Sequence, residues 1–387
     1  MRKPSKAFAW VCAMFVVMVV MVNAACSPTQ QGGPTRSGHL PRGVQWAYDA
    51  GGSITSRPTA AGDGLLFGST AGTFQMIGRK DGSLTWKYDA RADAPEAAFH
   101  HEPLVAEDLV LAATAGKGRG HVYAFDIATG QVRWKHELGA NAEGLGGADG
   151  EVVRHGDNAY VVGLNGQLIC LDLKTGRKNW EIGPVEPHIV PAAGPAHLYV
   201  AVGGTKVQGL DPLTGRAAWE ADLEATVTTS LMAQGDELFL GTSPFRMVRL
   251  DGKTGAVLSK IALQGKPVGN SAAASGVVSV FLRPAQETGD AAQTIIVLDS
   301  GLHRVLWGRK APEEWTSLHP QIWGDSILAG DRGGELVAFG PSDGVKRWSL
   351  KIDQGIGAIG TSEDMLYVGT LQGSVYACTP PAPAASS

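Results

Sequence analysis

A nine-residue pattern recurs along this chain and restricts the folds open to it more than any other feature. In its clearest copies, D-x-x-T-G is followed four residues after the glycine by tryptophan, at residues 126–134, 172–180 and 211–219. Weaker copies fill the gaps between these and extend the series. The last position of the successive copies falls at Trp86, Trp134, Trp180, Trp219, Ser259, Trp307 and Trp348. Intervals of 39 to 48 residues are typical of repeats with four strands each.

Each copy also predicts a tight hairpin. An alternating strand runs into Asp126, whose carboxylate can accept hydrogen bonds from turn N–H groups, and Gly130 supplies the positive φ that such a turn needs. Trp134 then falls on the returning strand, where a large ring fills the gap between neighbouring sheets. The recurring tryptophans are therefore predicted to dock one blade of a ring on the next.

The two ends of the repeat region complement each other. After Trp348 the chain offers three more strand patterns, ending near Cys378, while residues 44–48 form a lone strand that carries Trp46. Pairing these ends closes a ring and hides its exposed edges. The sequence thus predicts an all-β fold, an eight-bladed β-propeller over residues 43–380 with a disordered tail at 381–387. Seven blades remain the alternative if the copy that ends at Ser259 is not a true repeat.

The N-terminal segment is typical of an exported protein. Residues 1–25 are predicted to be a signal peptide, because a basic start is followed by an uncharged run at residues 7–22 and then by small residues. The uncharged run is short for a membrane span. The following N-A-A-C resembles a bacterial lipobox, which implies acylation of Cys26, and Ser27 resembles the residue that favours the outer membrane. Residues 26–42 would then be a flexible tether.

Asn23 departs from the lipobox pattern, because an aliphatic residue usually stands there. The alternative is cleavage by an ordinary signal peptidase, which would leave a soluble periplasmic protein. Loss of the leader removes three cations and no acid, so the formal charge falls from −4 to −7, which argues against a nucleic-acid partner. Cys170 and Cys378 lie in apolar strand patterns and are predicted to be buried free thiols.

The D-x-x-T-G-x-x-x-W copies resemble the pyrroloquinoline-quinone-type propeller repeat over roughly residues 43–378. Within that superfamily the size, the leader and the segments 318–320, 331–334 and 343–348 resemble the BamB family, lipoprotein subunits of the outer-membrane β-barrel assembly machinery. This resemblance implies a periplasm-facing outer-membrane lipoprotein that acts as a scaffold for protein partners, plausibly other barrel-assembly subunits.

Quinone-dependent dehydrogenases share the same blades, so an enzyme is the competing class. The resemblance to them implies a quinone-stacking tryptophan, a calcium site, a catalytic aspartate and often adjacent cysteines. This chain has no adjacent cysteines and no C-x-x-C-H sequence for a haem. We therefore expect no catalytic residues, no cofactor and no metal site, with a ligand-binding redox or sensor propeller as the alternative.

Residues outside the repeat pattern are the candidates for a binding site. Four blades are expected to start their innermost strand near a proline, at Pro58, Pro103, Pro191 and Pro320. Near these prolines lie Arg57, His100, His101, Glu102, His188 and His319. They are predicted either to form a small anion or metal pocket at one mouth of the central channel or to be solvated channel lining. The histidines lie on three different blades, a spacing too wide for one ion.

Two other features have two interpretations each. The glycine-rich residues 139–150 lack the lysine and the following helix of a phosphate loop, which favours a flexible connection between blades. Trp315 and Trp323 stand outside the repeat position, and they are either exposed anchors for a partner or packing residues at a blade end.

Overall fold

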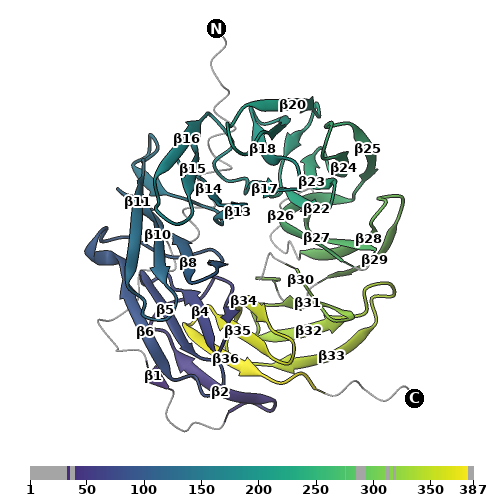
Figure 1. Ribbon diagram of the computed structural model, residues 1–387. Coiled ribbons are helices and arrows are strands. Elements are labelled where there is room, and N and C mark those ends of the chain that lie inside the picture. The colour runs from purple at the N-terminus through teal and green to yellow at the C-terminus, as the bar shows by residue number, and fades with distance from the viewer. Residues whose placement is uncertain are drawn as a thin grey trace. The chain divides into compact units, whose positions relative to one another are not determined.

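The computed structural model describes residues 33–34, 40–274, 276–284, 293–310, 314–316 and 320–381. The predicted signal peptide, Cys26 and His319 lie outside the described residues, as do most of the predicted tether and of the tail. The described residues from Gly33 onward belong to one compact unit. They form eight antiparallel sheets that are arranged in a ring (Figure 1), which confirms the predicted all-β propeller. In these ranges there is no helix long and apolar enough to cross a membrane.

The blades follow one another around the ring in chain order, each running from an innermost to an outermost strand. Blade 1 contains β3 (Thr59–Ala61), β4 (Gly64–Gly68), β5 (Thr73–Gly78) and β6 (Leu84–Asp89), and blade 2 contains β7 (Leu104–Ala106), β8 (Leu109–Ala113), β10 (Gly120–Asp126) and β11 (Val132–Leu138). Blade 3 contains β13 (Val153–His155), β14 (Asn158–Val162), β15 (Leu168–Asp172) and β16 (Lys178–Ile182). Blade 4 contains β17 (Ala192–Ala193), β18 (Leu198–Val202), β19 (Lys206–Leu210) and β20 (Ala217–Asp222). Blade 5 contains β21 (Thr226–Val227) and β22 (Met232–Gln234), which both pair with β23 (Glu237–Ser243), followed by β24 (Arg246–Asp251) and β25 (Val257–Ala262). Blade 6 contains β26 (Gly265–Ala274), β27 (Val277–Pro284), β28 (Thr294–Asp299) and β29 (Val305–Lys310). Blade 7 contains β30 (Gln321–Trp323), β31 (Ser326–Gly330), β32 (Glu335–Phe339) and β33 (Lys346–Lys351).

Blade 8 closes the ring with strands from both ends of the chain. It contains β34 (Ile356–Thr361), β35 (Leu366–Thr370), β36 (Ser374–Cys378) and the N-terminal β2 (Val44–Asp49). The antiparallel pairing of β2 with β36 is the predicted closure. A short strand, β1 (Gly33–Pro34), pairs with the outer side of β2, so part of the predicted tether extends this blade to five strands. Further elements are a 3₁₀ turn at Ala90–Ala92 and a two-stranded sheet of β9 (Ala115–Lys117) and β12 (Leu145–Gly147).

The repeat tryptophans contact the outer turn of the next blade. The indole N–H of Trp134 donates to the carbonyl oxygen of Leu173 at 3.1 Å, and its ring covers Gly176. Gly176 has a φ of +67°, and a Cβ added there would lie 2.4 Å from Trp134 Cδ2. Equivalent N–H bonds join Trp46 to Arg79, Trp86 to Ile127, Trp180 to Pro212, Trp219 to Gly252 and Trp307 to Pro341. The glycine and the indole of the pattern therefore pack against each other across six of the eight blade boundaries.

Two positions of the series depart from this contact. Ser259 has no ring, yet its Oγ donates to the carbonyl oxygen of Gly301 in the next blade at 2.7 Å. The hydroxyl thus makes the bond that the indole makes elsewhere, and the copy that ends at Ser259 is a true blade. Trp348 faces blade 8, whose outer strands β36 and β2 come from opposite ends of the chain and share no hairpin turn. Among the described residues its indole N–H has no hydrogen-bond partner.

The hydrophobic core lies between the blades, and three further residues of the sequence analysis are buried in it. Trp315 is 1% exposed and packs beside Phe281 and Phe339, so packing at a blade end is the correct one of its two interpretations. Cys170 and Cys378 are buried free thiols, as predicted. Burial raises the pKa of the Cys170 thiol to about 11 and that of Cys378 to about 12, so both thiols are inert at neutral pH.

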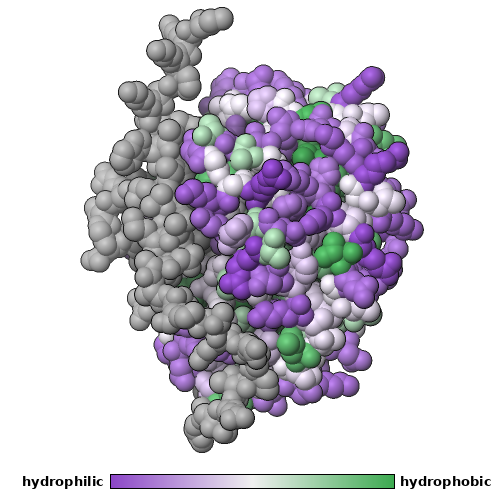
Figure 2. All heavy atoms as spheres, turned by 90° about the vertical axis from the view of Figure 1, so that its left-hand side faces the viewer, coloured by the Kyte–Doolittle hydropathy of each residue, from purple (hydrophilic) through white to green (hydrophobic). Residues whose placement is uncertain are grey.

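The outer surface is largely hydrophilic on the side that carries β6 and β11 (Figure 2), where apolar side chains stand singly. The large apolar side chains that are most exposed in the described residues are Leu40, Leu84, Leu213, Val257, Leu258, Val305 and Val345. All but Leu40 lie on outermost strands or their turns. Two of them, Val305 and Val345, lie beside exposed cations of blades 6 and 7.

Candidate functional site at the channel mouth

The innermost strands of blades 3 to 7 enclose a central channel with a volume of about 500 Å³. Small residues of β17, β22 and β26 form part of its wall. Polar side chains come from Arg57, Glu151, Ser230, Asn270, Ser271 and Gln321. Three of these, Arg57, Glu151 and Gln321, also line a smaller pocket, so the two cavities adjoin at one mouth of the channel.

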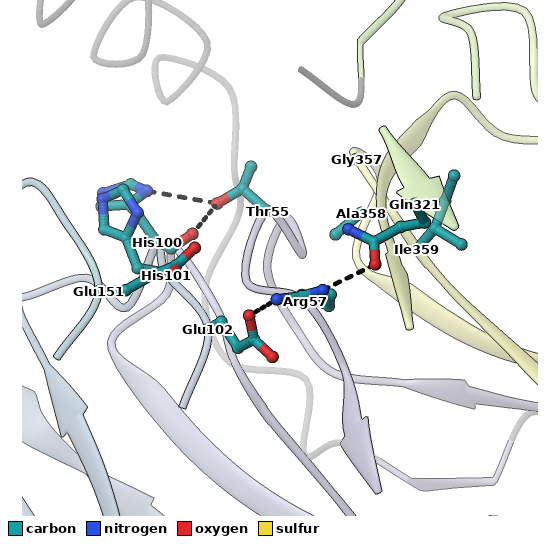
Figure 3. Close-up of a pocket in the computed structure, with 10 residues that line it drawn as sticks. All are labelled: Thr55, Arg57, His100, His101, Glu102, Glu151, Gln321, Gly357, Ala358 and Ile359. Carbon is teal, nitrogen blue, oxygen red and sulfur yellow. Dashed lines mark hydrogen bonds and ion pairs between the residues drawn. The ribbon is translucent and has the colours of Figure 1, made fainter. Parts of the chain in front are cut away.

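The smaller pocket has a volume of about 20 Å³, room for about one water molecule. Figure 3 shows Arg57 at its centre, between Glu102 and Gln321. The guanidinium forms an ion pair with the Glu102 carboxylate and donates to Gln321 Oε1 at 2.7 Å. These residues precede or begin the innermost strands of blades 1, 2 and 7. Burial lowers the pKa of Arg57, against the opposing charge of Glu151. Arg57 therefore ties three blades together at the mouth.

A second polar cluster joins blades 2 and 4 through one carboxylate. His101 Nε2 lies 3.2 Å from Asp149 Oδ1, and His188 Nδ1 lies 2.9 Å from Asp149 Oδ2. Burial lowers the pKa of His101, but the bond to Asp149 and the charge on it outweigh burial and raise the pKa overall. The bond to Asp149 likewise raises the pKa of His188. Although burial raises the pKa of Asp149, its two histidine partners hold it well below its usual range.

His100 behaves differently from its neighbour. Its Nδ1 lies 3.4 Å from Thr55 Oγ1, and no carboxylate is bonded to it in the described residues. Burial, followed by the charge of His101, lowers the pKa of His100 to about 4. The pKa of His100 therefore lies well below neutral pH, whereas the pKa values of His101 and His188 are raised above the ordinary histidine value.

The structure brings together five of the six predicted mouth residues, and the sixth, His319, lies outside the described residues. The sequence argument considered only whether the histidines could bind one ion and did not expect a shared protein partner. In the structure His101 and His188 both bond to Asp149. Asp149 was missed because it lies in the glycine-rich stretch interpreted as a flexible connection. That stretch instead contains β12, which pairs with β9 and places the carboxylate.

The arrangement suits polar ties between blades better than ion binding. No group of three or more His, Cys, Asp or Glu side chains in the described ranges has the geometry to hold a metal ion. Among the described residues, the side chains of Arg57, His101, Glu102, Asp149 and His188 make the hydrogen bonds and ion pairs given above with one another or with Gln321. Their chemistry permits binding of a water molecule or of a small polar group at the mouth.

Replacing Asp149 with asparagine is expected to lower the free energy of unfolding by about 2 kcal/mol near pH 6, because two charge-assisted hydrogen bonds are weakened in a site partly open to solvent. The raised pKa values of His101 and His188 mean that the protonated imidazoles stabilise the fold below about pH 6.5. This stabilisation disappears as the pH rises through the raised values. Urea unfolding near pH 9 should therefore show a smaller loss.

The matched control is Asp172→Asn, because the pKa of Asp172 is lowered by Thr175 rather than by a group that titrates in this range. The loss caused by Asp172→Asn should be the same at both pH values. Equal losses for Asp149→Asn near pH 6 and pH 9 would show that the histidine pair is not charged in the folded chain. Burial lowers the pKa of His100 to about 4 in the parent chain, so His100 does not titrate there between pH 6 and pH 9.

Comparison with known proteins agrees with the repeat pattern and the ring. The family model described as "Outer membrane protein assembly factor BamB" matches residues 42–194 and 118–297, together about two thirds of the chain. The assembly factor BamB of Shewanella oneidensis is 24% identical over 224 residues, which cover 56% of each protein. The chain spans about half the length of the curated relatives it matches.

Solved structures resemble the fold closely at low sequence identity. BamB from Moraxella catarrhalis matches with a TM-score of 0.66 and 16% identity over 89% of this chain and 99% of that one. A europium-containing methanol dehydrogenase matches with a TM-score of 0.62 and 14% identity over 84% of each chain. These two likenesses establish the propeller and do not distinguish a scaffold from an enzyme. The family model matches more than half of the sequence, and this chain therefore belongs to the family of the outer membrane protein assembly factor BamB.

Proposed function

We propose that this chain is a periplasm-facing lipoprotein scaffold that binds protein partners during the assembly of outer-membrane β-barrel proteins. Membership of the BamB family carries the proposal. The signal peptide and the lipobox-like N-A-A-C at residues 23–26 support export and anchoring through Cys26. In this account the chain is not an enzyme and has no cofactor, and the charged groups at the channel mouth hold the blades in place.

The outer edges of the blades suit the binding of extended segments. The outermost strands β6, β11, β16, β20, β25, β29 and β33 have no strand on their outer side among the described residues. In blade 8 that side is occupied by β1, whose Gly33 and Pro34 pair with Asp49 and Tyr48. The chain thus adds an extended segment to one of its own blades. A partner strand could pair with another blade edge through the same main-chain hydrogen bonds.

Affinity purification of the acylated chain from solubilised envelope of its own organism tests the proposal. We expect a barrel-assembly subunit to be recovered in stoichiometric amounts. Quinone and calcium added to the purified chain should give neither a bound chromophore nor dye reduction. Recovery of no barrel-assembly subunit, together with quinone-dependent dye reduction, would replace the scaffold with the redox propeller that its fold also permits.

A further inference from the structure

The perimeter of blades 6 and 7 carries an excess of positive charge. The outer turn and outermost strand of each blade hold three arginine or lysine side chains and one aspartate, over residues 299–310 and 343–351. We call these six cations the basic rim: Arg304, Arg309, Lys310, Lys346, Arg347 and Lys351. All six are exposed. The corresponding residues 211–222 of blade 4 hold three acids and one arginine, so the charge is not spread evenly around the ring.

Four of the six rim cations have no acidic partner among the residues that the structure describes. These are Arg304, Arg309, Lys310 and Lys351, whose Nζ donates to the carbonyl oxygen of Gly333. In blade 7, Lys346 and Arg347 pair with Glu335 and Asp343, yet both side chains remain about half exposed. The mature chain carries a net negative charge. Exposed cations without an acidic partner on such a chain are either solvated or available to bind an anionic partner.

Exposed apolar side chains accompany these cations. Val305 is 45% exposed at the start of β29, and Val345 is 50% exposed just before β33. The indole of Trp307, two residues after Val305, lies against Gly344 and donates to Pro341. The start of β29 and the turn before β33 therefore form one continuous stretch of surface. Cations beside exposed apolar side chains suit the boundary between lipid headgroups and acyl chains.

The position of Gly33 limits how far Cys26 can lie from the ring. Because β1 pairs with the outer side of β2, Gly33 lies on the perimeter of blade 8, which adjoins blades 7 and 1. Seven residue steps separate Gly33 from Cys26, and even a fully extended segment of that length spans about 25 Å. An acyl chain on Cys26 would therefore hold the perimeter of blade 8 close to the membrane.

We infer that the basic rim of blades 6 and 7 rests on the anionic lipid surface to which Cys26 is anchored, so that the propeller stands on its edge. The inference rests on the anchoring at Cys26 that is part of the proposed function. Each lysine or arginine near an anionic surface contributes about 1 kcal/mol. The rim orients a chain whose overall negative charge is repelled by the same surface, and it leaves blades 2 and 3, on the opposite side of the ring, free for partners.

Vesicle binding of the mature chain with Cys26→Ser tests the rim without the acyl chain. We expect it to sediment with vesicles that contain phosphatidylglycerol and not with phosphatidylcholine vesicles. The combined Arg304→Gln, Arg309→Gln and Lys310→Gln variant should bind at least about tenfold more weakly. The matched control neutralises three exposed cations of blades 3 and 4, outside the basic rim, Lys174, Arg177 and Arg216, and should lose less than about twofold.

Equal losses for the two triple variants, or equal binding to both kinds of vesicle, would overturn the inference. A second copy of the chain on the rim would appear instead as a dimer in sedimentation velocity that the rim variant dissociates, without binding to vesicles. Thermal unfolding of both variants should match the parent chain, since the substitutions are exposed. Partner capture is measured separately, so a failure of the rim would leave the scaffold proposal standing.

Orientation on a bilayer gives a second test on the acylated chain. A fluorophore on Val345→Cys, in blade 7, should be quenched by nitroxide-labelled lipid, whereas one on Leu213→Cys, in blade 4, should not. Both positions are exposed turn residues, and the native Cys170 and Cys378 are buried, so labelling is selective. Equal quenching at both positions, or stronger quenching at Leu213→Cys, would contradict an edge-on orientation.

Discussion

Trp134→Ala should lower the free energy of unfolding by about 3–5 kcal/mol, the range typical of a large aromatic side chain removed from a core. The ring is 8% exposed and belongs to the cluster of buried side chains between blades 2 and 3. Its removal leaves a cavity against Gly176, where no side chain can enter, and leaves the carbonyl of Leu173 without its donor. Both consequences arise at a blade boundary, so the loss should spread to blade 3.

Urea denaturation followed by circular dichroism measures this loss. The matched control is Trp348→Ala, because Trp348 is less buried and faces the one boundary that has no outer hairpin turn. The control should lose clearly less stability than Trp134→Ala. Equal losses at the two positions, or a loss below about 1 kcal/mol at Trp134, would show that the bond to the next turn is not what holds neighbouring blades together.

Deletion of β2 should have a still larger effect. A mature chain that begins at residue 50 lacks Trp46 and Tyr48, which are 8% and 0% exposed, and the hydrogen bond from the Tyr48 hydroxyl to Gln75 at 2.7 Å. We expect a loss of more than about 5 kcal/mol, since two buried aromatic side chains are removed together. The deletion also exposes the edge of β36 and opens the ring, which favours aggregation.

A chain that begins at residue 40 is the control, because it keeps β2 and loses only the preceding segment. Thermal unfolding with light scattering should give a cooperative transition for the control. The shorter chain should melt at a much lower temperature, with increased scattering. The same melting temperature for both chains would mean that the pairing of β2 with β36 does not hold the ring closed.

Much of the fold was predictable because each repeat signals itself locally. Gly130 and Trp134 have a fixed spacing within one hairpin, so the turn, the returning strand and the contact with a neighbouring blade follow from one short segment. Closure was predictable for the same reason, since Trp46 marks an outermost strand that lacks its blade. The copy at Ser259 left the number of blades open, because a hydroxyl gives no sequence signal that it replaces an indole N–H.

The channel mouth was only partly predictable. Arg57, His101 and His188 precede innermost strands, and the propeller collects such positions around one mouth. Which side chains meet there depends on how far each loop reaches into the channel. Asp149 is carried by the loop after β12, and nothing in the glycine-rich sequence shows that this loop turns back toward His101 and His188.

Deletion of the gene in the organism that carries this chain tests most directly whether the protein is an assembly scaffold. The amount of folded β-barrel protein in the outer membrane can be measured, because folded barrels resist unfolding in detergent that has not been heated. We expect their amount to fall in the deletion strain and to recover when the acylated chain is restored. An unchanged amount of folded barrel protein in the deletion strain would contradict a role in barrel assembly.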